Sequence, residues 1–341
     1  MKKAHAYLIG AVMISTSLII SQGCTKSTDD DEDLIGNWKK SDDFEGNARS
    51  EAASFTIGDF AYVCSGTTAT ERFKDLWEYS TSRRYWIQKA DLPGVARNSA
   101  IAFSIGTKGY VGTGYDGSTR LKDFWEYDQA SDTWSPRADF AGTARYDAVA
   151  FSVDGKGYIG CGYDGNYLKD FWQYDPVQNQ WNQKASVGGS KRSAAMAFVV
   201  NGQAFICSGN NNGEIQKDLW AYNAASNEWT EKTKIYDYSE DDSYDDDYGT
   251  IPRQNGVTFV IGNYVYLATG ESNSVTNTTT WQYDPATDRW TEKTGFEGTA
   301  RTGAVGFSLN NRGFVTTGRN VSLVMDNTYE LLPNDEQVDN D

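Results

Sequence analysis

Tryptophan recurs at a nearly constant interval along the chain, and this periodicity limits the fold more than any other feature. Members of one series are separated by 48, 48, 47, 48 and 61 residues, and a second series runs nine residues ahead of the first. The first series is Trp38, Trp86, Trp134, Trp181, Trp229 and Trp290, and the second is Trp77, Trp125, Trp172, Trp220 and Trp281. A fixed period of this length is typical of stacked structural repeats. Because all 11 tryptophans occupy repeat positions, we expect core residues rather than a ligand platform.

Each repeat has the pattern of four short strands. In the second repeat the strands are expected at 99–104, at 109–114, at 123–127 and around Trp134. Turns between the first and second strands carry residue pairs that tolerate positive φ, namely Asp154-Gly155, Asn201-Gly202 and Asn310-Asn311. Beyond residue 24 no amphipathic helical period is sustained, and the chain has only 6 prolines. The sequence therefore predicts an all-β fold.

The two ends of the repeat array complement each other. The sixth repeat has Tyr329 where the others have the leading tryptophan, and it stops at Asp341 without a fourth strand. Residues 34–40, which include Trp38, resemble a fourth strand that has no repeat of its own. We expect this N-terminal strand to complete blade six and close the ring, because an open ring leaves sheet edges exposed.

The repeat unit resembles the kelch motif. It consists of an apolar strand, a small residue followed by Gly, the series Asp-aromatic-Trp-x-Tyr-Asp, a short turn and Trp. The usual Gly-Gly pair is replaced by pairs such as Ser65-Gly66, Thr113-Gly114 and Cys161-Gly162. The resemblance extends from residue 34 to about residue 332. It implies a six-bladed kelch-type β-propeller over residues 34–341.

The segment before the repeats is typical of an export signal. Residues 1–23 combine a lysine pair with an apolar stretch too short to span a bilayer. The residues that end at Cys24 resemble a bacterial lipobox, which implies a lipid on that cysteine. The acidic tether 24–33, which starts at this cysteine, resembles the signal that sends lipoproteins of Bacteroidetes-type bacteria to the outer face of the outer membrane. An ordinary signal peptide with an incidental cysteine is the alternative. We expect a protein held at the membrane by the lipid alone and facing the cell exterior.

Charge and residue content exclude several kinds of chemistry. The formal net charge is -16, which disfavours binding to nucleic acid. The single histidine, His5, lies in the predicted signal peptide, so a processed chain has no imidazole for a triad or a zinc site. We expect no cofactor and no metal. We also expect Cys64, Cys161 and Cys207 to be small buried residues, with a reactive thiol as the alternative.

Function is expected on one face of the propeller. In an up-and-down four-stranded blade, the loops after the second and fourth strands gather on the same face, around the mouth of the central channel. Six arginines stand where the loop after each fourth strand enters the next blade: Arg49, Arg97, Arg145, Arg192, Arg253 and Arg301. They form either a guanidinium ring for an anion or structural pairs with Asp75, Asp123, Asp170 and Asp218. We favour the pairs.

Blades five and six lack this aspartate, because Thr279 and Asn327 occupy its position. If pairing occurs within a blade, Arg253 and Arg301 have no acidic partner, and we predict ligand contact for them. Further candidates lie in the loops after the second strands: Tyr115, Asp116, Tyr163, Asp164, Asn211, Glu271 and Arg319. Such side chains suit sugar hydroxyls and equally suit solvated loops. An acidic insertion at 236–248 is expected to be a mobile lid, with a calcium site as the alternative.

Two functions fit these features. The first is a non-enzymatic surface protein that binds a glycan or another protein. The alternative is a sugar-acid isomerase or mutarotase similar to N-acetylneuraminate epimerase, because the arginines suit a carboxylate; no motif marks a catalytic base. The repeats also resemble those of galactose oxidase. That activity is excluded, since its copper site requires histidine.

Overall fold

The computed structural model describes residues 34–240, 244–339 and 341. The predicted signal peptide, Cys24 and the acidic tether lie outside the described residues. The described residues all belong to one compact unit, Leu34–Asp341. Among the described residues, no helix has the length and apolarity that crossing a membrane requires.

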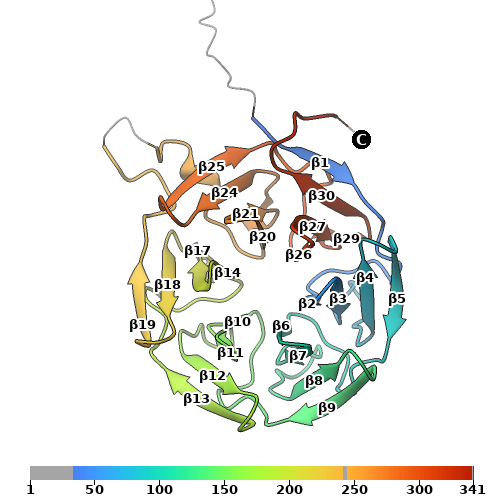
Figure 1. Cartoon of the computed structure of the whole chain (residues 1–341). Helices are drawn as coiled ribbons and strands as arrows, with labels where there is room; N and C mark the ends of the chain where they lie inside the picture. The colour runs from blue at the N-terminus through green and yellow to red at the C-terminus, as the bar shows by residue number, and fades with distance from the viewer. Residues whose placement is uncertain (1–33, 241–243, 340) are drawn as a thin grey trace, which may run out of the picture. The chain divides into compact units, whose positions relative to one another are not determined.

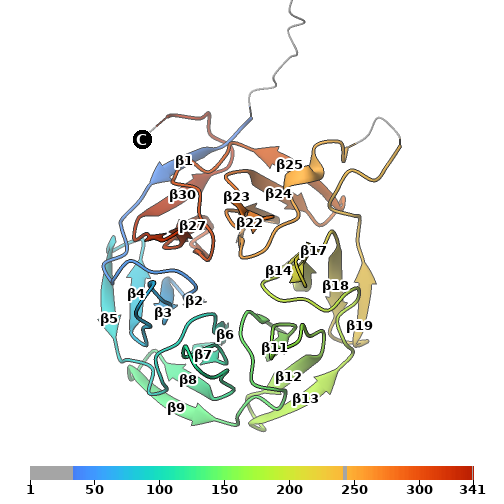
Figure 2. The same ribbon diagram turned by 180° about the vertical axis from the view of Figure 1, so that it is seen from behind.

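The unit Leu34–Asp341 is a ring of six antiparallel four-stranded sheets (Figure 1), and Figure 2 shows the same ring from behind. The fold predicted from the repeats is thus confirmed. Six strands line the channel: β2 (Ala53–Ile57), β6 (Ile101–Ile105), β10 (Val149–Val153), β14 (Met196–Val200), β20 (Val257–Ile261) and β26 (Val305–Leu309). The second strands are β3 (Phe60–Cys64), β7 (Lys108–Gly112), β11 (Lys156–Gly160), β15 (Gln203–Cys207), β21 (Tyr264–Ala268) and β27 (Arg312–Thr316).

The third and fourth strands form the outer half of each blade. The third strands are β4 (Leu76–Ser80), β8 (Phe124–Asp128), β12 (Phe171–Asp175), β18 (Leu219–Asn223), β24 (Thr280–Asp284) and β30 (Thr328–Leu332). The outermost strands are β5 (Tyr85–Lys89), β9 (Thr133–Arg137), β13 (Gln180–Lys184), β19 (Glu228–Glu231), β25 (Arg289–Lys293) and β1 (Asn37–Lys40). Blades are numbered one to six from β2 to β26, so that blade one contains β2 to β5.

The N-terminal strand closes the ring, as predicted. Strand β1 pairs antiparallel with β30 in the sheet order β1-β30-β27-β26, and Trp38 lies opposite Leu331. The indole N–H of Trp38 donates to Thr280 Oγ1 of blade five at 3.0 Å, and the side chain is fully buried. Blade six therefore joins the two ends of the repeat array, and no blade is left with a missing strand.

Two closed circles of backbone hydrogen bonds connect the blades. In the first circle, the N–H of each residue two positions after a repeat arginine donates to the equivalent carbonyl of the preceding blade, at 2.7 to 3.2 Å. Its members are Glu51, Ser99, Asp147, Ala194, Asn255 and Gly303. In the second circle, the glycine of each small-Gly pair donates to the carbonyl of the arginine in the next blade, for example Gly66 to Arg97 at 2.9 Å. Because both circles close on themselves, six similar repeats form one ring.

The core lies between neighbouring blades. Inner-strand residues alternate between buried and half-buried, as expected for strands with one face toward the next blade. Phe55 on β2 stacks on Tyr62 at 4.9 Å, and Gly109 of blade two lies against the same ring. A Cβ at Gly109 would come within 2.2 Å of Phe55, so this contact requires glycine.

The predictions for tryptophan and cysteine agree with the structure. Trp38, Trp86, Trp281 and Trp290 are buried, and the other seven are partly buried. Cys64, Cys161 and Cys207 are free and fully buried, and burial raises the pKa of each thiol to about 12. A thiol that stays protonated is a poor nucleophile, which supports the packing role.

Candidate functional site

The loops after the second and fourth strands meet on one face, as expected. Isolated β-bridges join the loop before each inner strand to the loop after the second strand of the same blade, for example Asn98 with Tyr115, and Tyr146 with Tyr163. In blades four to six the loop after the second strand is a small hairpin: β16 (Asn210–Asn211) with β17 (Glu214–Ile215), β22 (Glu271–Ser272) with β23 (Val275–Thr276), and β28 (Arg319–Asn320) with β29 (Leu323–Val324).

The repeat arginines of blades one to four form buried ion pairs within the blade. The Nη1–Oδ1 distances are 2.5 to 2.6 Å in Arg49–Asp75, Arg97–Asp123, Arg145–Asp170 and Arg192–Asp218. A second contact from Nη2 makes each pair bidentate, and the same aspartate accepts the indole N–H of the tryptophan two residues later. All four arginines are fully buried, which confirms the structural interpretation.

Arg253 in blade five has no acidic partner, as the sequence indicates, and it too is fully buried. Its Nη1 donates to the carbonyls of Thr269 at 2.7 Å and Thr279 at 3.2 Å. Its Nη2 donates to Thr279 Oγ1 at 2.8 Å and to the carbonyl of Thr250 at 2.5 Å. Burial lowers its pKa to about 10. The protein already uses these donors, so the geometry gives no support to ligand contact.

Arg301 in blade six is also fully buried, and burial lowers its pKa to about 10. Nη1 donates to the carbonyl of Thr317 at 2.8 Å, but Nη2 has no hydrogen-bond partner among the described residues. The guanidinium packs over Phe296, with 5.0 Å from Cζ to the ring centroid. Neither arginine reaches solvent at the channel mouth, and we leave both out of the site.

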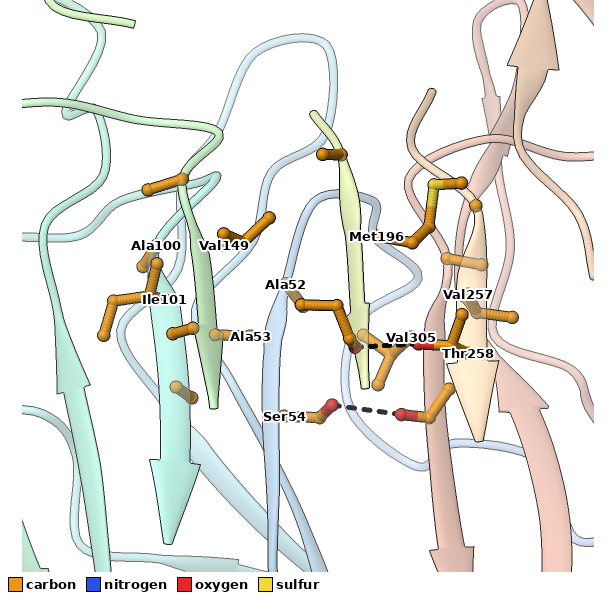
Figure 3. Close-up of a pocket in the computed structure, with 18 residues that line it drawn as sticks. Ala52, Ala53, Ser54, Ala100, Ile101, Val149, Met196, Val257, Thr258 and Val305 are labelled. Atoms are coloured by element: carbon orange, nitrogen blue, oxygen red, sulfur yellow. Dashed lines mark hydrogen bonds between the residues drawn. The ribbon is translucent and has the colours of Figure 1, made fainter. Parts of the chain in front are cut away.

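The channel is lined by small side chains of the six inner strands (Figure 3). The cavity within it has a volume of about 290 Å³. Ser54 Oγ donates to the carbonyl of Gly306 at 3.3 Å, and Thr258 Oγ1 donates to that of Ala197 at 3.0 Å. Figure 3 shows mainly alanine, valine and isoleucine side chains around this space. None of the described residues that line this cavity is charged.

The mouth is bordered by the side chains of the first hydrogen-bonded circle. These six residues all have positive φ, between 51° and 61°. A second cavity of about 190 Å³ lies among them. Only Glu51 and Asp147 of these residues are acidic, and they stand in blades one and three. The repeat thus places two carboxylates at the channel entrance.

The two carboxylates have different environments. Glu51 pairs with Arg319, with 3.2 Å between Oε1 and Nη2, and it accepts Asn98 Nδ2 at 2.6 Å. Asp147 forms no ion pair within the described residues. Burial and the charge of Glu51 raise the pKa of Asp147 to about 7, although Ser99 and Arg319 act in the opposite direction. Asp147 is therefore an acid whose charged form the protein stabilises poorly.

A third cavity, of about 490 Å³, adjoins the mouth above blades three to five. We call it the tyrosine pocket. Its walls carry Tyr146, Tyr163, Tyr167, Asp147 and polar side chains that include Asn210, Gln254 and Asn255. Tyr146 and Tyr163 meet edge to face at 5.6 Å, and Tyr163 meets Tyr167 at 5.1 Å. Arg120 stacks on Tyr163 at 5.4 Å without lining the cavity. Aromatic rings beside amides can stack on and hydrogen-bond a polar ligand.

The loop residues predicted from the sequence have different surroundings in the structure. Tyr163 lines the tyrosine pocket, while Tyr115 packs against Tyr146 at 5.4 Å outside it. Asp116 and Asp164 accept backbone N–H groups of their own turns. The remaining three line neither the mouth cavity nor the tyrosine pocket: Asn211 lies in β16, Glu271 accepts Gln254 Nε2 at 2.9 Å, and Arg319 pairs with Glu51.

The acidic insertion lies at the outer edge of blade five where it is described. Tyr248, at the start of the 3-10 helix η1 (Tyr248–Thr250), is buried and bonded to the backbone of Trp290 in β25. Arg289 of the same outermost strand stacks on Tyr244. This packing against the strand farthest from the channel differs from a lid over the mouth. Carboxylate oxygens of Asp237, Asp245 and Asp246 lie within 4.8 Å of one another, and Asp245 accepts the N–H of Tyr238.

Sequence reasoning missed Glu51, Asp147 and Asn255 at the mouth, and Tyr146, Tyr167 and Gln254 in the tyrosine pocket. A signal was present, because the two positions after each repeat arginine vary strongly between otherwise similar repeats. They read Ser-Glu, Asn-Ser, Tyr-Asp, Ser-Ala, Gln-Asn and Thr-Gly in blade order. Positions that vary among otherwise similar repeats indicate the surface on which each repeat can make its own contacts.

Comparisons with known proteins agree with this architecture. A family model of the KLHDC2/KLHL20/DRC7 kelch-repeats domain matches residues 36–195. The solved structure entitled "Structure of YjhT" superposes with a TM-score of 0.70 at 14% identity, covering 84% of this chain and 95% of that chain. No curated protein sequence matches significantly. Likeness to a solved structure at this identity shows fold alone. From the repeats, the closed ring and the family match, this chain is a kelch-repeat β-propeller.

Proposed function

We propose that this protein is a non-enzymatic binding protein of the cell surface whose tyrosine pocket holds part of a glycan. One observation supports this most: the pocket of about 490 Å³ is lined by three tyrosines together with amide and hydroxyl side chains. Pockets of this size commonly hold small ligands. Sugar rings stack on aromatic faces, and their hydroxyls pair with amides such as Gln254 and Asn255.

The lipid anchor forms the second half of the proposal. A lipid on Cys24 and an acidic tether would hold the propeller outside the outer membrane, where glycans are available. This part rests on the sequence alone. Mass spectrometry of the membrane-extracted protein should find a diacyl or triacyl group on Cys24, and Cys24→Ala should release the protein from membranes. A chain that stays membrane-bound after Cys24→Ala would contradict the anchor.

The mouth gives little support to a sugar-acid isomerase. That activity needs cations for the substrate carboxylate, yet all six repeat arginines are fully buried. Arg319 already pairs with Glu51. An anionic sugar would also meet Asp147 and a chain of net charge -16.

Titration calorimetry with a panel of neutral oligosaccharides tests the pocket. We expect at least one to bind, with affinity reduced tenfold or more in Tyr163→Ala, because the ring supplies the stacking surface. Tyr264→Ala is the matched control, since Tyr264 is exposed at the start of β21 on the opposite face. Binding that survives Tyr163→Ala, or that is lost equally in Tyr264→Ala, would refute this site.

A further inference from the structure

The two acids at the channel mouth differ in what compensates their charge. Glu51 is held by a guanidinium at 3.2 Å, by the Asn98 amide at 2.6 Å and by the hydroxyl of Ser99 at 3.2 Å. For Asp147, no lysine or arginine in the described part of the chain lies within ion-pair distance. Arg319 therefore compensates the charge of Glu51. The charge of Asp147 has no such partner among the described residues, so a bound ligand can supply one.

Asp147 also lies at the junction of two cavities. It lines both the mouth cavity of about 190 Å³ and the tyrosine pocket of about 490 Å³. Among the described residues that line the tyrosine pocket, it is the one carboxylate, and no lysine or arginine lines it. A ligand in this pocket meets a single formal charge, and that charge is negative.

The aromatic lining favours the same kind of ligand. Tyr146, Tyr163 and Tyr167 stand beside Asp147 in the pocket wall. Tyrosine faces attract cations, and recognition of amines by aromatic rings is a common use of that attraction. Outside the pocket, Arg120 stacks on two of these rings, at 6.0 and 5.4 Å from Tyr146 and Tyr163, so both rings already pack against one positive group. The acidic chain as a whole attracts cationic ligands from a distance.

We infer that the glycan held in the tyrosine pocket carries a free, protonated amine, which binds the carboxylate of Asp147 beside the tyrosines of the pocket wall. This inference rests on the proposed function and narrows it to amino sugars that lack an N-acetyl group. The neutral amides of Asn210, Gln254 and Asn255 then meet the sugar hydroxyls, and the tyrosines exclude water from the ion pair.

The inference predicts how pH affects binding. Glu51 from blade one, Ser99 from blade two and Arg319 from blade six surround the Asp147 carboxylate, and burial with Glu51 keeps its pKa near 7 in the free protein. An ammonium stabilises the ionised form, so binding lowers this pKa and affinity rises with pH through that range. The rise stops where the ligand amine itself loses its proton.

Three tetrasaccharides that differ in one group provide the test: cellotetraose with a hydroxyl, N-acetylchitotetraose with an acetamide, and the fully deacetylated glucosamine tetramer with an ammonium. Calorimetry at low salt and pH 6.5 should give at least tenfold tighter binding of the ammonium tetramer. Asp147→Asn should remove this preference, so that the three tetrasaccharides bind with similar affinity. Asp164→Asn is the matched control, because it removes one charge from the same face without lining the pocket.

The possible failures are distinguishable. Equal affinity for all three sugars, tighter N-acetylchitotetraose, or a preference that persists in Asp147→Asn would overturn the amine inference and leave glycan binding in place. If none of the three binds and tetralysine does, the pocket serves a protein partner, and the inference and the proposed function both fail. Loss of the preference in Asp164→Asn as well would attribute it to overall charge and also overturn the site.

Discussion

Blades one to four and blades five and six hold the same buried arginine in different electrostatic surroundings. In blade two, Arg97 binds the carboxylate of Asp123 at 2.6 Å through both Nη atoms. In blades five and six the partner positions are Thr279 and Asn327, and burial lowers the pKa of both arginines to about 10. Full burial of a cation without a counter-charge is costly, so the arginine must be retained for something other than its ion pair.

The contacts that the arginine makes in all six blades show what this other role is. In every blade, Nη1 donates to the carbonyl of the residue 16 positions later, at 2.7 to 3.0 Å. The arginine's own carbonyl accepts the glycine N–H of the preceding blade. The side chain thus fixes the loop that carries the interblade hydrogen bond. The aspartate compensates the charge in four blades but is not needed for this anchoring.

Removal of the arginine should have the largest effect, and the effect should differ between the two groups. Arg97→Leu leaves the Asp123 carboxylate partly buried without its cation, so we expect a loss of about 3–5 kcal/mol in the free energy of unfolding. Arg301→Leu leaves no carboxylate behind and should cost about 1–3 kcal/mol. Urea unfolding at pH 7 measures both. Equal losses would mean that the aspartate adds nothing.

Removal of the acid alone converts blade two to the composition of blade six. Asp123→Asn should cost about 2–3 kcal/mol at pH 7, because hydrogen bonds to a charged partner are lost. Burial raises the pKa of Asp123, but Arg97 outweighs it and the net pKa lies below its usual value. The wild-type advantage is therefore present above about pH 4 and is lost as pH falls through the folded-state pKa. A pH-independent difference down to pH 2 would contradict the ion pair.

Asp147 is the converse case, an acid without an arginine. Its folded pKa of about 7 exceeds the usual value, so the folded state binds the proton more tightly than the unfolded state. Stability should therefore fall as pH rises from about 4 to 7, by about 1–2 kcal/mol once channel water is allowed for. Asp147→Asn should remove this slope, as thermal or urea unfolding across pH 4–8 can establish. An unchanged slope would mean that Asp147 titrates normally.

The sequence allowed the fold to be predicted, but of its candidate site residues only Tyr163 lines the tyrosine pocket, for a physical reason. Trp38 and the strand-forming repeats encode contacts within a blade or with the next one, so their period alone predicts six blades and the closing strand. The site instead depends on which different side chains six equivalent positions bring together across the ring. Asp147 and Gln254 are 107 positions apart in the chain yet line one cavity, and spacing along the sequence gives no sign of this.

The same limit applies to Arg253 and Arg301. The sequence correctly indicated that they lack an acidic partner, but not that carbonyls would occupy their donors. The carbonyl of Thr250 lies two residues after the acidic insertion, whose path no repeat predicts. The absence of an acidic partner suggested that each guanidinium is free to bind a ligand. Backbone carbonyls instead accept most of its hydrogen bonds.

Restoring the acid in blade six should have the smallest effect of the four changes. Asn327→Asp places a carboxylate of equal size beside Arg301, whose Nη2 has no partner within the described residues, and Oδ1 of Asn327 is likewise buried without one. We expect a gain of about 1 kcal/mol at pH 7, which is lost in acid as the new carboxylate is protonated.

Thr279→Asp in blade five is the matched variant. It should gain less, because the Nη donors of Arg253 already bond Thr269, Thr279 and Thr250. If both variants gain equal stability, the gain comes from the restored negative charge and not from the unused Nη2 donor of Arg301. If Asn327→Asp destabilises the protein, blade six has adapted its packing to a neutral partner, and the arginine serves there as a backbone anchor alone.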